Sequence, residues 1–60
     1  FIDPPQEVIG LTCSDAIAII YRELGFTMVG IKPKKEPLKI NPNGHIINST
    51  DEILVINPVN

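Results

Sequence analysis

Residues 32–40 hold the densest group of charges in the 60-residue chain. Four lysines, Lys32, Lys34, Lys35 and Lys39, stand there against a single acid, Glu36. Ammonium groups bind phosphate oxygens, so two copies of this group meeting across a dimer axis could hold a phosphate-bearing ligand. A solvated hairpin loop accounts for the same residues more simply, and the pattern favours that interpretation.

The other side chains that could do chemistry are few and scattered. His45 could titrate near neutral pH or bind a metal, but it follows a turn sequence, and we expect an exposed turn residue. Cys13 would gain thiolate character at a helix N-terminus, although a small, partly buried first-turn residue is the simpler interpretation. Asp51 and Glu52 could contribute to a cation site, yet neighbouring strand residues point to opposite faces, so we expect turn and edge residues.

No nucleophile, base and orienting group share a predicted face, so the sequence predicts no enzyme. One cysteine and one histidine exclude a disulfide within the chain and a four-ligand zinc site. No cofactor and no metal are therefore expected in this segment. Nucleic acid is not an expected partner, because one Tyr, two Phe and no Trp provide few stacking groups.

The length of the chain allows one domain with a small core. A chain of this size buries only roughly 60% of its unfolded surface. Its hydrophobic content of 43% is high for so short a chain. An apolar surface too large for a monomer predicts oligomerisation or attachment to a larger body. No apolar run approaches the ~20 residues of a membrane span. Residues 1–7, with two consecutive prolines, are expected to be an extended linker from an upstream domain.

A helix is predicted over residues 13–24. Thr12 suits its N-cap, Asp15 follows three residues later, and Gly25 suits the left-handed residue that ends a helix. Between these signals, apolar residues recur at helical spacing and form one broad face. They are Ala16, Ile17, Ile19, Ile20 and Leu24.

The nearly unbroken apolar run at residues 26–31 predicts a central strand covered on both faces. Gly30 within this run could permit the close approach of a backbone or a ligand. Shorter strands are expected at residues 7–10 and 38–40, and in the second of these Lys39 should face water.

The second half of the chain alternates turns with short apolar segments. Asn41-Pro42-Asn43-Gly44 has dense turn chemistry, in which Asn43-Gly44 should supply positive φ values. Residues 45–47 are long enough only for a bridge, and residues 52–57 predict a last strand that Pro58 stops. The predicted fold class is α+β, a small β-α-β-β-β unit with one amphipathic helix on a mixed sheet.

The core should form where the helix meets the two apolar strands. Its expected members are Ile17, Ile20, Leu24, Val29, Ile31, Leu54 and Ile56. The remaining apolar surface should form a dimer contact, with Tyr21 at its border. Replacing Leu54 with Asp should abolish folding, because it would bury an unpaired charge.

This order of elements resembles the C-terminal subdomain of RCK domains, also called TrkA-C. These are regulators of potassium conductance in ligand-gated potassium channels and in Trk/Ktr-type uptake systems. The matching segments are residues 9–12 (Ile-Gly-Leu-Thr), 25–32 (Gly-Phe-Thr-Met-Val-Gly-Ile-Lys), 40–42 (Ile-Asn-Pro) and 51–56 (Asp-Glu-Ile-Leu-Val-Ile). The chain departs from the family pattern at Thr50, where a glycine is usual.

The resemblance implies that residues 8–58 are a cytoplasmic regulatory subdomain of a potassium channel or potassium uptake protein. Such a subdomain pairs with its copy in another subunit and follows a Rossmann-like half that binds nucleotide. It couples a ligand, cyclic di-AMP or a metal ion in known members, to gating of a membrane pore, without itself entering the membrane. The expected ligand site consists of Ile31, Lys32, Lys39 and Asn41.

Two other classes remain open from the sequence. One is a generic protein-interaction or structural dimerisation module that shares the same order of elements. The other is a non-catalytic ligand-binding appendage of an enzyme. A Rossmann half and pore helices upstream of Phe1 would support transport, whereas a catalytic domain there would exclude it.

Overall fold

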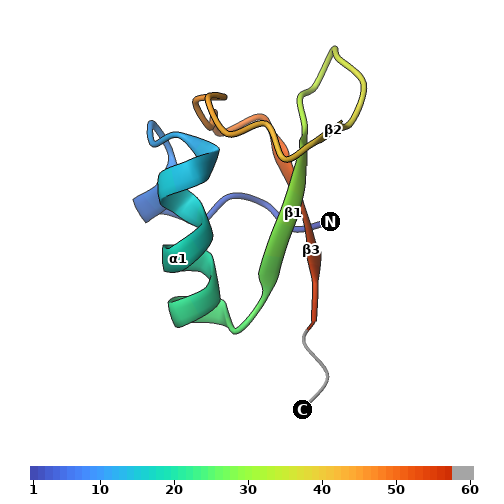
Figure 1. Cartoon of the computed structure of the whole chain (residues 1–60). Coiled ribbons are helices and arrows are strands. Elements are labelled where there is room, and N and C mark those ends of the chain that lie inside the picture. Colours follow the sequence, from blue (N-terminus) through green and yellow to red (C-terminus); the bar gives the residue numbers. More distant parts are fainter. Residues whose placement is uncertain (58–60) are drawn as a thin grey trace.

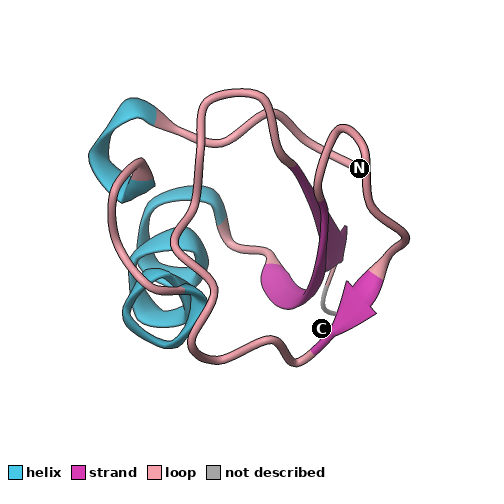
Figure 2. Ribbon diagram, turned by 90° about the horizontal axis from the view of Figure 1, so that it is seen from above, coloured by secondary structure: helices cyan, strands magenta, loops and turns pink. Residues whose placement is uncertain are grey.

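One helix packs on one face of a three-stranded sheet in the computed structural model, which describes residues 1–57 (Figure 1). The elements are a short 3₁₀ helix η1 (Gln6–Val8), α1 (Cys13–Leu24), β1 (Thr27–Lys32), β2 (Lys39–Ile40) and β3 (Glu52–Ile56). Seen from above, α1 lies to one side of the strands (Figure 2). The fold class is thus α+β, as predicted.

The predicted helix is confirmed at both ends. α1 spans Cys13–Leu24, and the side-chain Oγ1 of Thr12 accepts the N–H of Asp15 at 3.2 Å. Gly25 adopts φ 74° and donates its N–H to the carbonyl of Tyr21. Glycine reaches this left-handed region without the steric cost that a Cβ atom imposes, so it ends the helix cleanly.

The predicted central strand is also confirmed, because β1 lies between β2 and β3. Both neighbours run antiparallel to β1, so the expectation of a mixed sheet is wrong. The pairing of β1 with β3 shifts register between Met28 and Gly30. This bulge lets Met28 and Ile31 both join the core, although they are an odd number of positions apart in the strand.

The expected core is only partly correct. Ile20 and Ile31 are fully buried, but Ile17, Leu24 and Ile56 are 37%, 44% and 55% exposed. Val29 and Leu54 are half-buried. The buried cluster consists of Val8, Cys13, Ala16, Ile20, Met28, Ile31, Ile47 and Ile53.

The last strand shows why that assignment failed. β3 faces the helix through Ile53 and not through Leu54, because Ile53 pairs with the buried Ile31. Successive strand residues point to opposite faces. Since β3 is apolar on both sides, its sequence pattern could not select the inner one.

The start of the chain belongs to the fold. Ile2 and Ile53 exchange two backbone hydrogen bonds of 2.9 Å, which attach the first residues to the free edge of β3. The strand expected at residues 7–10 is wrong, because η1 forms there and buries Val8. The predicted stop at Pro58 lies outside the described residues.

The turn after β2 differs in detail from the prediction. Its positive φ belongs to Asn41, at 50°, and not to Asn43-Gly44. Asparagine tolerates this region better than most residues. The expected bridge is present, because Ile46 pairs with Thr12. Among residues 1–57, no helix has the length and apolar character needed to cross a bilayer.

Candidate functional site

The expected ligand residues lie together at the hairpin formed by β1 and β2. Ile31 pairs with Lys39 across the strands, and the N–H of Asn41 donates to the carbonyl of Val29 at 3.1 Å. Lys32 follows directly at the end of β1. Ile31, however, is fully buried and serves the core. The hairpin therefore offers three of the four expected side chains to a ligand.

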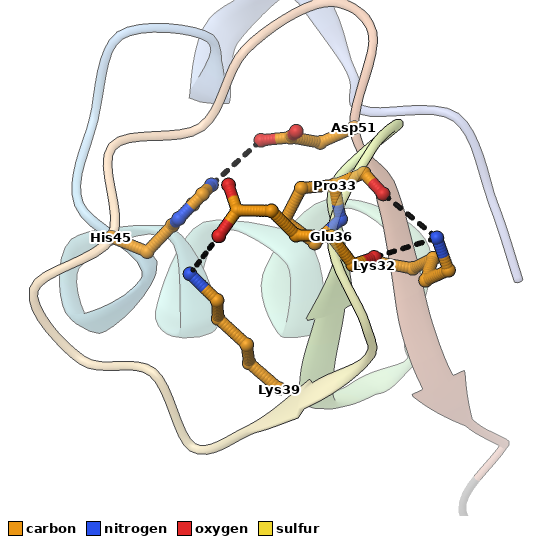
Figure 3. A network of polar contacts seen from close by, with 6 residues as sticks. All are labelled: Lys32, Pro33, Glu36, Lys39, His45 and Asp51. Atoms are coloured by element: carbon orange, nitrogen blue, oxygen red, sulfur yellow. Dashed lines mark hydrogen bonds and ion pairs between the residues drawn. The ribbon is translucent and has the colours of Figure 1, made fainter.

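The ammonium group of Lys32 closes the hairpin loop. Its Nζ donates to the carbonyl oxygens of Pro33 at 2.9 Å and of Glu36 at 2.7 Å (Figure 3). Hydrogen bonds from a charged donor are stronger than neutral ones. Lys32 thereby orders the loop that follows it and keeps less hydrogen-bonding capacity for an external anion.

Lys39 and Glu36 form an ion pair of 2.9 Å across the same loop. The pKa of Glu36 is lowered, first by the hydrogen bond from Lys39 and then by its charge. Both side chains are largely exposed, so water and salt weaken the pair. Lys39 faces water, as predicted, with 40% of its side chain exposed, although it pairs with Ile31 on the core side of the sheet. Ile40 lies on the other face and is 61% exposed.

A partly buried pair, which the sequence analysis missed, joins His45 to Asp51. The Nε2–H of His45 donates to Oδ2 of Asp51 at 2.8 Å, and their side chains are 16% and 3% exposed. The same oxygen accepts a hydrogen bond from the N–H of Asn48 at 2.9 Å, and the N–H of Asp51 donates to the carbonyl of Asn48 at 3.0 Å. The expectation that His45 is exposed is therefore wrong, whereas Asp51 closes a turn, as expected, with its side chain buried.

The segment that carries His45 also caps the start of α1. The N–H of Cys13 donates to the carbonyl of His45 at 2.9 Å, and the N–H of Ser14 donates to the carbonyl of Asn43 at 3.2 Å. Together with Thr12, these carbonyls occupy the N–H groups that a helix start leaves free. The helix N-terminus is therefore satisfied within the chain and does not present these groups to an anion.

Cys13 lies beneath this segment and is 1% exposed. Burial raises the pKa of its thiol, and the negative charge of Asp51 raises it further. Both effects disfavour the thiolate, which is the nucleophilic form. The interpretation of Cys13 as a buried first-turn residue is confirmed.

The polar side chains of the hairpin loop and of the segment from His45 to Asp51 face one another. Glu36, Lys39, His45 and Asp51 lie near one another (Figure 3). Across residues 1–57, no three His, Cys, Asp or Glu side chains gather as a metal site, and no pocket forms. The arrangement can fix the loops in place and present a mixed-charge rim.

A second candidate surface lies on the face of the sheet opposite α1. Ile40 and Leu54 both pair with Gly30, so the three residues share that face. The Cδ1 atoms of Ile40 and Leu38 lie 3.3 and 3.5 Å from the position of a Cβ on Gly30. Ile56 follows Leu54 by two residues and is exposed. We define the outer patch as Leu38, Ile40, Leu54 and Ile56.

Comparison with known proteins finds no family model that matches the chain, and no curated protein or solved structure that resembles it significantly.

Proposed function

We propose that the chain is a cytoplasmic regulatory subdomain of a potassium channel or potassium uptake protein, acting as a homodimerising module that senses a ligand. It performs no catalysis of its own. The proposal rests on the resemblance to RCK C-terminal subdomains, and the order of one helix followed by three strands supports it. A Rossmann-like half upstream and a membrane pore complete the proposed parent protein.

The outer patch is the observation that carries the dimerisation proposal. Three of its members, Leu38, Ile40 and Ile56, are 41%, 61% and 55% exposed, although the solvated face of an antiparallel sheet usually carries polar residues. Three of the eight exposed large hydrophobic residues in the described part of the chain lie in this patch. Contiguous exposed apolar patches mark interaction sites.

The charges at the edge of the outer patch favour a second copy as the partner. Lys32 and Glu52 are cross-strand neighbours on the face of Gly30 and Leu54. A surface edged by both signs can meet its own copy with opposite charges facing each other, as two-fold symmetric interfaces require. The small core of a chain this size also gains from burying the patch.

Concentration-dependent NMR spectra test the outer patch as the dimer surface. Shift changes on dilution should concentrate in β2 and β3, and Ile40→Lys should remove them. Tyr21→Lys is the matched control, because Tyr21 lies on α1, on the other side of the sheet from the outer patch and not at its border as the sequence suggested. Its exposed fraction of 58% is close to the 61% of Ile40. Chemical-shift changes on dilution that concentrate in α1 and disappear only in Tyr21→Lys would contradict the outer patch as the dimer surface.

Ligand sensing is tested separately with cyclic di-AMP, mononucleotides and divalent cations as probes. A ligand that binds only the folded state stabilises it by RT ln(1 + c/Kd) at free ligand concentration c, so the melting temperature rises with the ligand concentration. We expect a shift with one of these probes, and a smaller one in Lys39→Ala and Asn41→Ala. If none of the probes shifts the transition, the proposal reduces to a dimerising scaffold.

A further inference from the structure

The turn at Asn43 and Gly44 places an asparagine side chain next to an accessible backbone nitrogen. Both residues are exposed, and the turn is closed by the N–H of His45 donating to the carbonyl of Pro42 at 2.9 Å. No atom outside residues 43–45 lies within 4 Å of the position that a Cβ on Gly44 would occupy. Among the hydrogen bonds within residues 1–57, none involves the N–H of Gly44.

We propose that Asn43 is a site of spontaneous deamidation through a cyclic imide formed with Gly44. The backbone nitrogen of Gly44 attacks Cγ of Asn43, a new N–Cγ bond forms, and the Cγ–Nδ2 bond breaks. The side-chain amide leaves as ammonia, carrying the proton that the Gly44 nitrogen loses. Water then opens the imide at Cγ to give aspartate, or at the backbone carbonyl carbon to give isoaspartate.

The remaining asparagines in the described part of the chain are poorer substrates. Asn41 and Asn57 precede prolines, whose nitrogen has no proton to lose. Asn48 precedes a serine. Its N–H donates to the carboxylate of Asp51, and its carbonyl accepts the N–H of Asp51. Glycine adds no side chain that hinders ring closure. The reaction should therefore start at Asn43.

Deamidation at this position would disturb the start of α1. The carbonyls of Asn43 and His45 accept the N–H groups of Ser14 and Cys13 at 3.2 and 2.9 Å. In isoaspartate the main chain runs through Cβ and Cγ, and the original carbonyl of residue 43 becomes a carboxylate beside it, so both acceptors cannot keep their positions. The segment should loosen and uncover Cys13, which is 1% exposed in the intact chain.

Incubation of the purified chain in mildly alkaline buffer tests the site. Intact mass should show an amide exchanged for a hydroxyl, and peptide fragmentation with isoaspartyl methyltransferase labelling should place it at Asn43. Gly44→Ala should slow the reaction roughly tenfold, because a side chain then hinders ring closure, whereas Asn48→Gln should leave the rate unchanged. Equal rates in Gly44→Ala and the unaltered chain, or a first product at Asn48, would overturn the proposal.

The predicted loosening has its own readout in the reactivity of Cys13 toward an aromatic disulfide reagent. The isoaspartate fraction, separated by chromatography, should react faster than the starting chain. Asn43→Asp is the matched control, because it adds the same charge while keeping the normal main chain, and it should react like the starting chain. Equal rates of Cys13 modification in the isoaspartate fraction, in Asn43→Asp and in the starting chain would overturn the predicted loosening of the segment.

Discussion

The imidazole Nε2 of His45 donates a hydrogen bond to the carboxylate Oδ2 of Asp51 at 2.8 Å, and Asp51 is only 3% exposed. This contact fastens the segment that caps α1 to the turn that leads into β3. Because Asp51 also accepts the N–H of Asn48, the carboxylate organises its own turn as well. The pair thus connects the helix start with the last strand.

Loss of this pair should destabilise the fold. Asp51→Ala should lower the free energy of unfolding by about 2–4 kcal/mol, because the His45 ring and the Asn48 N–H lose their acceptor. His45→Ala should lower it by about 1–3 kcal/mol, because the buried carboxylate loses a donor. Urea denaturation measures both changes. The double variant should cost less than the sum of the single ones. Additive costs would show that the two side chains are not coupled.

Gly30→Ala should also destabilise the chain. A Cβ at this position would lie 2.7 Å from the backbone oxygen of Lys39, so β1 and β2 would have to separate. We expect a loss of roughly 1–3 kcal/mol, the range for overpacked sites. Gly44→Ala, which meets open space, is the control and should stay within about 0.5 kcal/mol. Equal effects would contradict the close approach of the two strands.

Charges at neighbouring positions of β3 should act differently. Ile53→Asp places a carboxylate in the core, where Ile53 is fully buried, and should abolish folding. Leu54→Asp, on the outer patch, should leave a folded chain that is weakened by about 1–2 kcal/mol and no longer dimerises. Circular dichroism separates the two outcomes. Unfolding by Leu54→Asp alone would reverse our assignment of the inner face.

The raised pKa of Cys13 predicts a loss of stability in alkali. The folded state retains the thiol proton above the ordinary pKa of 9.0, where the unfolded chain has lost it. The contribution of Cys13 is therefore complete below that value and declines as pH rises through the raised folded pKa. Unfolding free energies between about pH 8 and pH 10 should fall more steeply in the unaltered chain than in Cys13→Ala. Parallel curves would contradict the burial effect.

Local signals in the sequence were enough to predict the helix and its ends. Thr12 and Gly25 act through backbone chemistry within a few residues, and the structure confirms both. The long apolar runs likewise predicted the central and last strands. The closing of the loop by Lys32 was not predicted, because its acceptors are carbonyl oxygens that every residue carries.

Features that depend on distant pairing were not predictable. The bulge after Met28 and the pairing of Ile53 with Ile31 decide which face is inner, and an all-apolar strand does not encode that choice. The pair of His45 and Asp51 spans a turn whose path the sequence leaves open. The turn sequence Asn48-Ser49-Thr50 could have indicated that Asp51 binds the backbone, since polar side chains in such turns often accept hydrogen bonds from nearby N–H groups.

The mass of the chain in solution tests the central claim most directly. Multi-angle light scattering at micromolar concentration should give twice the chain mass of 6.6 kDa, because the outer patch is then covered by a second copy. Ile40→Lys should return the mass to that of one chain while the circular dichroism spectrum stays unchanged. A mass of 6.6 kDa for the unaltered chain at the same concentration would contradict the dimerising module that we propose.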